Sequence, residues 1–256
     1  MTLLDRWTTG SFEGAGRSFP TYRRGAGPGV IVIHEIPGVT PNVIAFADRV
    51  VAAGFTVVMP SLFGTPGKEP SITYGIASMV KGCVSKEFTA LALGKTPPIA
   101  TWLRALAAAL HTELGGPGVG AVGMCFTGGF ALTMMLDEHT VAPVLSQPSN
   151  PLFIRGSRYG ADLNLSPADL AVVRTRAAAG CEVLGLRYTD DKLVGGRFDT
   201  LRRELGDKFL AVEIPSRKPR DHSVLTEEAD QAAIERVLAF FVEKLRPATA
   251  LMLGEE

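Results

Sequence analysis

The sequence predicts an α/β fold in which a mostly parallel sheet is covered by helices on both faces. Short apolar runs rich in β-branched residues alternate with segments of helical periodicity, which is the pattern of βαβ units. The 256 residues suit a single domain with at most a modest lid. Hydrophobic residues make up 46% of the chain and charged residues 20%, so we expect a packed core and no global disorder.

The predicted elements begin near residue 30, after a glycine-rich turn at 25–29. Glycine and proline residues mark where they end: Gly54 ends the first predicted helix, and Pro60 ends the second predicted strand. The predicted strands are 30–34, 55–59, 119–123, 141–145, 182–188 and 209–214. The predicted helices are 43–53, 99–114, 126–136, one with Ser166 as its N-cap, 197–205, and a last one from 226 to about 245.

Residues 61–98 interrupt this alternation. The segment is rich in Gly, Pro, Lys and Ser and has only scattered apolar residues. Loops of this length usually have a role, so we expect a lid or an insertion that covers the substrate. The alternative is an ordinary pair of short helices over the sheet.

Charge and cysteine content exclude several classes of protein. The 26 basic and 26 acidic side chains balance, so nothing points to nucleic acid or to an anionic membrane surface. Cys83, Cys125 and Cys181 are too few and too scattered for a disulfide framework, and without a C-x-x-C pair no structural zinc site is expected. The first 16 residues predict neither a signal peptide nor a membrane span. We therefore expect a reducing, cytoplasmic location.

Ligands of parallel sheets bind at the carboxyl ends of the strands, so we expect the catalytic or ligand-binding side chains to follow those ends. The first predicted strand ends in His34-Glu35-Ile-Pro-Gly38. A buried strand rarely delivers a carboxylate, because an unpaired ionised Glu is costly to bury. Glu35 is either an active-site acid beside an oxyanion-hole turn or a residue that caps the next helix.

The most informative segment is Gly123-Met-Cys125-Phe-Thr-Gly-Gly129, between a predicted strand and a predicted helix. A nucleophile elbow requires this context, because the sharp turn lifts the side chain above the sheet. The same turn places Cys125 at a helix N-terminus, where the dipole favours a thiolate. A buried structural cysteine is the alternative. The context favours a nucleophile.

A carboxylate and a histidine follow in the required order. Asp190 and Asp191 stand just past a late strand, where the acid of a catalytic triad belongs, although Asp also favours turns. His222 lies between the last strand and the last helix, whereas the other three histidines are expected to make ordinary polar contacts. Nucleophile, acid and histidine follow one another in this order in α/β-hydrolases.

Together these segments resemble the dienelactone hydrolase family of the α/β-hydrolase fold. The resemblance spans the chain from about Val30 to the last helix. It implies that Cys125, His222 and Asp191 form the triad, with Asp191 preferred over Asp190 because a short loop follows it. It also implies that Glu35 pairs with the resting thiol and that the backbone amides of Ile36 and Phe126 form the oxyanion hole.

Two departures bear on this resemblance. Thr127 stands where the family's elbow usually has glycine, and a β-branched residue is less comfortable in a strained turn. The 61–98 segment and the loop at 147–151 do not match the small family members, which leaves the substrate open.

The expected reaction is hydrolysis of a small ester or lactone through a thioester, without metal or organic cofactor. Arg217, Lys218 and Arg220 could bind a substrate carboxylate or simply form a solvated basic loop. A monomer or homodimer is expected, with no nucleic-acid or membrane partner. A thioesterase, an acyltransferase, a non-catalytic binding module and a redox-sensing cysteine remain alternatives.

Overall fold

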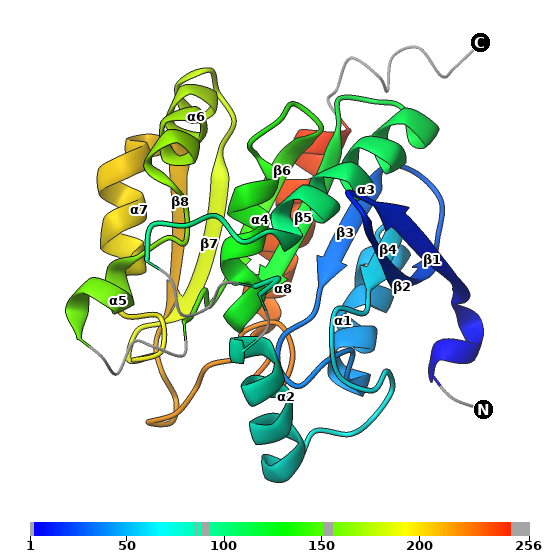
Figure 1. Cartoon of the computed structure of the whole chain (residues 1–256), viewed down its shortest axis with the longest axis horizontal. Coiled ribbons are helices and arrows are strands. Elements are labelled where there is room, and N and C mark those ends of the chain that lie inside the picture. The colour runs from blue at the N-terminus through cyan, green and yellow to red at the C-terminus, as the bar shows by residue number, and fades with distance from the viewer. Residues whose placement is uncertain (1–2, 85, 89–92, 151–155, 247–256) are drawn as a thin grey trace.

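The computed structural model describes residues 3–84, 86–88, 93–150 and 156–246. Eight strands form one sheet in the order β1-β2-β4-β3-β5-β6-β7-β8 (Figure 1). The strands are β1 (Thr8–Gly14), β2 (Arg17–Arg24), β3 (Gly29–Ile33), β4 (Thr56–Pro60), β5 (Val119–Met124), β6 (Thr140–Ser146), β7 (Val183–Tyr188) and β8 (Phe209–Ile214). The α-helices are α1 (Pro41–Ala52), α2 (Ile72–Val84), α3 (Ile99–Leu114), α4 (Gly128–Met134), α5 (Ser157–Ala161), α6 (Pro167–Ala178), α7 (Arg197–Leu205) and α8 (Gln231–Leu245).

The predicted mostly parallel sheet is confirmed. Strands β3 to β8 pair in parallel, and their carboxyl ends therefore lie at the same edge. The bounds predicted for α3, α7 and β8 agree with the structure. In α6, Ser166 is the N-cap and its hydroxyl accepts a hydrogen bond from the amide of Asp169, as predicted.

The N-terminal hairpin β1–β2 was not predicted. Most of β1 is exposed, so it lacks the apolar run that marks a buried strand. The two strands are joined by a tight two-residue turn at Ala15 and Gly16. Both residues have positive φ, at 50° and 71°, as such a hairpin turn requires. The hairpin is held down by Phe12 and Phe19, which pack edge-on against Trp102 of α3.

The start predicted for the last helix is wrong. Helix α8 begins at Gln231, where the Asp230 side chain caps it by accepting a hydrogen bond from the amide of Ala233. Residues 224–228 form a turn instead, and this turn carries Thr226 towards the carboxyl edge of the sheet. Thr226 therefore belongs to the site and not to the helix.

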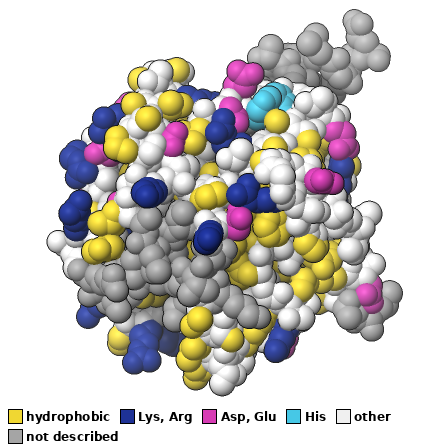
Figure 2. All heavy atoms as spheres, in the orientation of Figure 1, with side chains coloured by type: hydrophobic (Ala, Val, Ile, Leu, Met, Phe, Trp, Pro, Cys, Tyr) yellow, Lys and Arg dark blue, Asp and Glu magenta, His cyan; other side chains and the backbone are white. Residues whose placement is uncertain are grey.

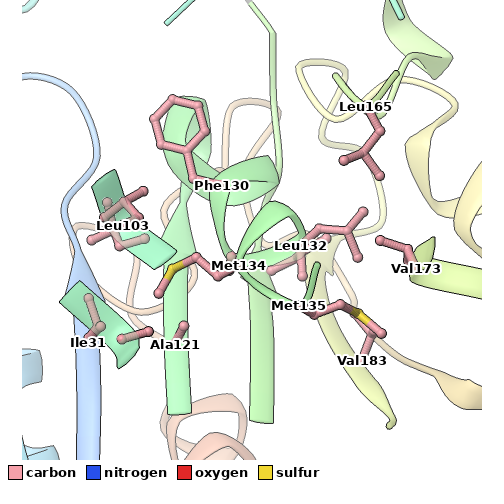
Figure 3. Close-up of a cluster of buried hydrophobic side chains, with 14 of the residues drawn as sticks. Ile31, Leu103, Ala121, Phe130, Leu132, Met134, Met135, Leu165, Val173 and Val183 are labelled. Carbon is pink, nitrogen blue, oxygen red and sulfur yellow. The ribbon is translucent and has the colours of Figure 1, made fainter. Parts of the chain in front are cut away.

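Helices cover both faces of the sheet, as predicted, and each layer buries its own apolar cluster. Helices α1 and α8 lie behind the sheet in Figure 1, and α3, α4 and α6 lie in front. Figure 3 shows how α4 fills the front layer: Met134 points between Leu103 and Ala121, and Met135 lies beside Val183. Because α4 directly follows the turn at Cys125, this packing fixes that turn on the sheet.

The 61–98 segment contains helix α2 and is attached at both ends to the elbow region. Phe63 and Phe88 contact each other, and both contact Phe126, with ring centroids 5.6–6.2 Å apart. Helix α2 lies beyond the carboxyl edge of the sheet, at the bottom of Figure 1. Its outer face exposes Ile72 (83%) and Ile76 (54%). Whether the segment moves as a lid stays a prediction, as does the single-domain organisation.

Acidic and basic side chains are mixed over the face seen in Figure 2, in keeping with the zero net charge. Among the residues that the structure describes, none of the helices has the length and apolar character that crossing a membrane requires.

Candidate active site

Cys125 lies on a strained turn between β5 and α4. Its φ is +53°, a left-handed conformation that a residue with a Cβ adopts only at a cost. The chain can turn this tightly because Gly123 and Gly128 flank it. A Cβ on Gly123 would lie 2.2 Å from the carbonyl oxygen of Thr127, and one on Gly128 would lie 2.6 Å from the Cα of Pro148. These contacts are the local geometry of a nucleophile elbow.

Thr127 holds this turn in place and does not distort it. Its backbone is right-handed, with φ −89°, so the β-branched side chain is unstrained. Its fully buried hydroxyl accepts a hydrogen bond from the amide of Met124 at 3.1 Å. The hydroxyl proton has three carbonyl oxygens within reach, those of Ile33 at 3.2 Å and of His34 and Met124 at 3.0 Å each. The threonine thus ties the elbow to the end of β3.

His222 and Asp191 form a close pair. Nδ1 of His222 lies 2.7 Å from Oδ2 of Asp191, and Oδ1 of Asp191 accepts a hydrogen bond from the amide of Leu193 at 3.0 Å. Asp190 is exposed, and its backbone amide donates to the hydroxyl of Ser216. The preference for Asp191 over Asp190 therefore agrees with the geometry.

Cys125, His222 and Glu35 converge at the carboxyl edge of the sheet. The Cys125 sulfur, a His222 ring nitrogen and a Glu35 carboxylate oxygen all lie within 4.8 Å of one another. Nε2 of His222 is buried and has no hydrogen-bond partner among the described residues. Burial alone would lower the pKa of His222, but the charge and the close sulfur of Cys125, together with the hydrogen bond to Asp191 and its charge, outweigh burial and raise that pKa well above its ordinary value.

Glu35 is buried. Within the described part of the chain, its carboxylate accepts hydrogen bonds from three side chains, and the Cys125 thiol is not one of them. The Ser223 hydroxyl donates at 2.9 Å and the Gln147 amide at 3.3 Å, and the Thr226 hydroxyl donates as well. Burial raises the pKa of the Glu35 carboxyl, and the hydrogen bonds from Thr226 and Ser223 with the charge of His222 oppose that rise.

The sulfur of Cys125 has a different neighbour. It lies 3.2 Å from the hydroxyl oxygen of Ser149, and the Ser149 amide donates to the Cys125 carbonyl at 2.9 Å. Ser149 is on the loop after β6, which begins with Gln147 in a left-handed conformation, φ 33°. This loop brings both Ser149 and Gln147 to the site.

The basic residues considered for substrate binding are arranged differently from one another. The Arg217 guanidinium donates to the Tyr188 hydroxyl at 2.7 Å and to the Glu228 carbonyl at 3.1 Å, so it braces the loop that carries His222. Arg220 and His222 both line a cleft of about 500 Å³. A substrate role for either arginine stays a prediction.

The remaining described histidines make ordinary polar contacts, as expected. His34 donates from Nδ1 to the carbonyl of Glu35 and accepts at Nε2 from the amide of Leu62. Burial lowers the pKa of His34 to about 4, so the ring is neutral. His111 and His139 contact each other through their Nδ1 atoms, 3.1 Å apart.

Comparison with protein families gives a match to the dienelactone hydrolase family over residues 18–147, just over half of the chain. The chain belongs to this family. Membership makes it a carboxylic ester hydrolase, and members of the family act on small ester substrates. No curated protein matches the sequence.

Solved structures of the dienelactone hydrolase class share the fold at low sequence identity. A dienelactone hydrolase from Anabaena variabilis is 16% identical, with a TM-score of 0.63 over 94% of this chain and 98% of that one. A putative dienelactone hydrolase from Klebsiella pneumoniae is 17% identical, with a TM-score of 0.59 over 93% and 98%. A dienelactone hydrolase-like promiscuous phosphotriesterase from metagenomic libraries is 17% identical, with a TM-score of 0.62 over 93% and 98%.

Sequence reasoning missed several polar residues of this family member's site. Gln147 and Ser149 follow β6 at its carboxyl end, so the rule that ligands bind at strand ends could have pointed to them. Ser223 directly follows His222 and Thr226 comes shortly after, but their contacts with Glu35 are made across 188 and 191 positions of sequence. No local pattern indicates such a contact.

Proposed function

We propose that the protein hydrolyses small carboxylic esters or lactones with Cys125 as nucleophile, His222 as base and Asp191 as the residue that orients the base. One observation carries the proposal. The sulfur of a cysteine on a strained elbow lies within 4.8 Å of a ring nitrogen of His222, whose buried Nε2 has no hydrogen-bond partner among the described residues and whose ring is fixed by a carboxylate. A nucleophile, a base and an orienting acid in this relation are the parts of acyl-transfer catalysis.

The reaction then has two halves. Nε2 of His222 takes the proton of the Cys125 thiol, and the thiolate attacks the carbonyl carbon. The tetrahedral intermediate collapses to a thioester as His222 gives its proton to the leaving alcohol. Water then attacks the thioester carbonyl carbon while His222 takes a proton from the water. The carboxylic acid product leaves, and His222 returns its proton to the Cys125 thiolate.

The amides of Ile36 and Phe126 are proposed to hold the oxyanion. Ile36 follows the end of β3 and Phe126 follows the end of β5, and these strands are parallel neighbours that pair Ile33 with Gly123. Both amides therefore belong to the edge at which the nucleophile lies. Each such donor is worth about 3 kcal/mol of transition-state stabilisation in related sites.

Ser149 is proposed to hold the sulfur of Cys125 in the resting enzyme. The resemblance assigned this task to Glu35, but the Glu35 carboxylate accepts hydrogen bonds from Ser223, Gln147 and Thr226. Ser149 is the residue whose hydroxyl contacts the sulfur, at 3.2 Å. Binding of the acyl group would displace this contact and turn the sulfur towards His222.

The test is a panel of p-nitrophenyl esters, lactones and dienelactones, assayed with the wild type and with Cys125→Ala. We expect turnover by the wild type, none by Cys125→Ala, and wild-type activity in Cys181→Ala, because Cys181 lies on another part of the chain. Intact mass spectrometry of quenched reactions should find one acyl group on the wild type only. Undiminished hydrolysis by folded Cys125→Ala would end the proposal, and acyl transfer to an added alcohol or thiol faster than to water would make the enzyme an acyltransferase.

A further inference from the structure

The residues at the proposed active site form a donor set for a soft divalent cation. Cys125 offers a thiolate, His222 an imidazole nitrogen and Glu35 a carboxylate oxygen, and these atoms lie within 4.8 Å of one another. Zinc binds thiolate at about 2.3 Å and imidazole or carboxylate at about 2.0–2.2 Å, so its ligand atoms lie about 3.3–3.6 Å apart. Small side-chain rotations would close the difference.

The imidazole is prepared for a metal. Asp191 accepts the hydrogen bond from Nδ1 of His222, so in the neutral ring the lone pair is on Nε2, and Nε2 is buried without a partner among the described residues. A carboxylate bonded to the far nitrogen of a histidine is the usual outer-shell arrangement of zinc ligands, because it fixes the tautomer and the ring orientation. This unpartnered nitrogen is an observation independent of the donor cluster.

The carboxylate is also oriented and has a free coordination position. Oε2 of Glu35 accepts from Ser223 and Gln147, whereas Oε1 accepts from Thr226 alone among the described residues. A carboxylate oxygen has two lone pairs, so Oε1 retains one for a metal. The three hydrogen bonds then act as an outer shell that holds the ligand in place.

Charge balance favours a dication in this enclosed place. A thiolate and a carboxylate together carry two negative charges, so a bound Zn²⁺ makes the centre neutral, whereas either anion alone is costly to bury. Thiolate and imidazole select zinc over magnesium or calcium, which prefer oxygen ligands. Three protein ligands leave the fourth tetrahedral position for water.

We infer that Cys125, His222 and Glu35 bind one Zn²⁺ ion, which occupies the nucleophile and the base and so reversibly blocks the enzyme. Binding needs a thiolate and a neutral imidazole, so the metal displaces any proton that Cys125 or Nε2 of His222 carries, and the displaced protons go to solvent. The sulfur leaves Ser149 in the process. That zinc inhibits rests on the proposed function, whereas that zinc binds does not.

Cobalt reports on this site directly. We would titrate chelator-treated wild-type protein with Co²⁺ under nitrogen and record the near-ultraviolet thiolate-to-cobalt charge-transfer band and the visible bands of four-coordinate cobalt. We expect one equivalent to bind, the bands to collapse on adding Zn²⁺, and ester hydrolysis to be lost with zinc and restored by a chelator.

Variants assign the ligands. The charge-transfer band should be absent in Cys125→Ser and unchanged in Cys181→Ser, the matched control at the other described cysteine. Asp191→Asn, which alters only the outer shell, should weaken binding about 10–100-fold. Glu35→Gln should weaken it by at least as much, because a ligand is lost.

Two results would overturn the inference: no band in the wild type at stoichiometric cobalt, or a band that persists in Cys125→Ser. The outcomes also separate the two proposals. A Cys125-dependent cobalt band in a protein that hydrolyses no ester would refute the proposed function and leave the zinc site standing. Cys125-dependent hydrolysis that is unaffected by zinc, without a cobalt band, would do the reverse.

Discussion

Replacing Thr127 by Val should destabilise the protein by about 2–4 kcal/mol. Valine has nearly the shape of threonine but cannot accept the hydrogen bond from the buried amide of Met124. A buried donor left without an acceptor costs about 1–3 kcal/mol, and losing the hydroxyl's own hydrogen bond to the end of β3 adds about 1 kcal/mol. For a chain of this size the loss corresponds to a fall in Tm of about 4–16 °C.

The assay is thermal and urea unfolding of Thr127→Val beside Thr133→Val. Thr133 is a matched control because it is also fully buried and lies in α4. Its hydroxyl donates to the Phe130 carbonyl at 2.7 Å, and no hydrogen bond to its oxygen is observed among the described residues. Removing it therefore leaves no amide unpaired, and the loss should be under about 1.5 kcal/mol. Equal stability of the two variants would refute the view that Thr127 secures the elbow.

Three further predictions concern the site. Asp191→Asn should lower kcat on a cleaved ester on the order of 10³–10⁴-fold and Asp190→Asn less than about twofold, so equal losses would contradict the assignment of Asp191. Ser149→Ala should speed alkylation of Cys125 by iodoacetamide at neutral pH about 2–10-fold, the worth of one hydrogen bond, and an unchanged rate would remove Ser149 from the resting state. Burial lowers the pKa of His34 from 6.5 to about 4, so between these pH values the unfolded chain binds the extra proton and stability falls as the pH drops, by up to about 3 kcal/mol. Urea unfolding at several pH values should give a flatter profile for His34→Gln, and a wild-type slope would count against this account.

Local sequence was enough for most of the framework. The alternation of apolar runs with helical periodicity predicted β3 to β8 and their covering helices. Strands β3 to β7 are buried almost throughout and leave a nearly continuous apolar run, whereas the edge strand β8 is only partly buried and leaves an alternating one. The context of Cys125 between strand and helix predicted its tight turn, and chain order pointed to the contact that His222 and Asp191 make; that the three residues form a catalytic triad stays a prediction. The hairpin β1–β2 was not predicted because few residues of its strands are buried.

What only the tertiary structure decided is how the polar side chains pair. The sequence predicted that Thr127 would be strained in a tight turn, but its hydroxyl connects two strands that are about 90 positions apart in sequence. Glu35 read as the partner of the thiol, yet its hydrogen bonds reach Thr226 and Ser223, while Ser149 contacts the sulfur. Periodicity records which face of an element is buried, and it is silent on which distant donor meets which acceptor. Those contacts are set by the spatial order of the strands in the sheet and by the loops at their carboxyl ends. They therefore follow from the fold and not from any single segment.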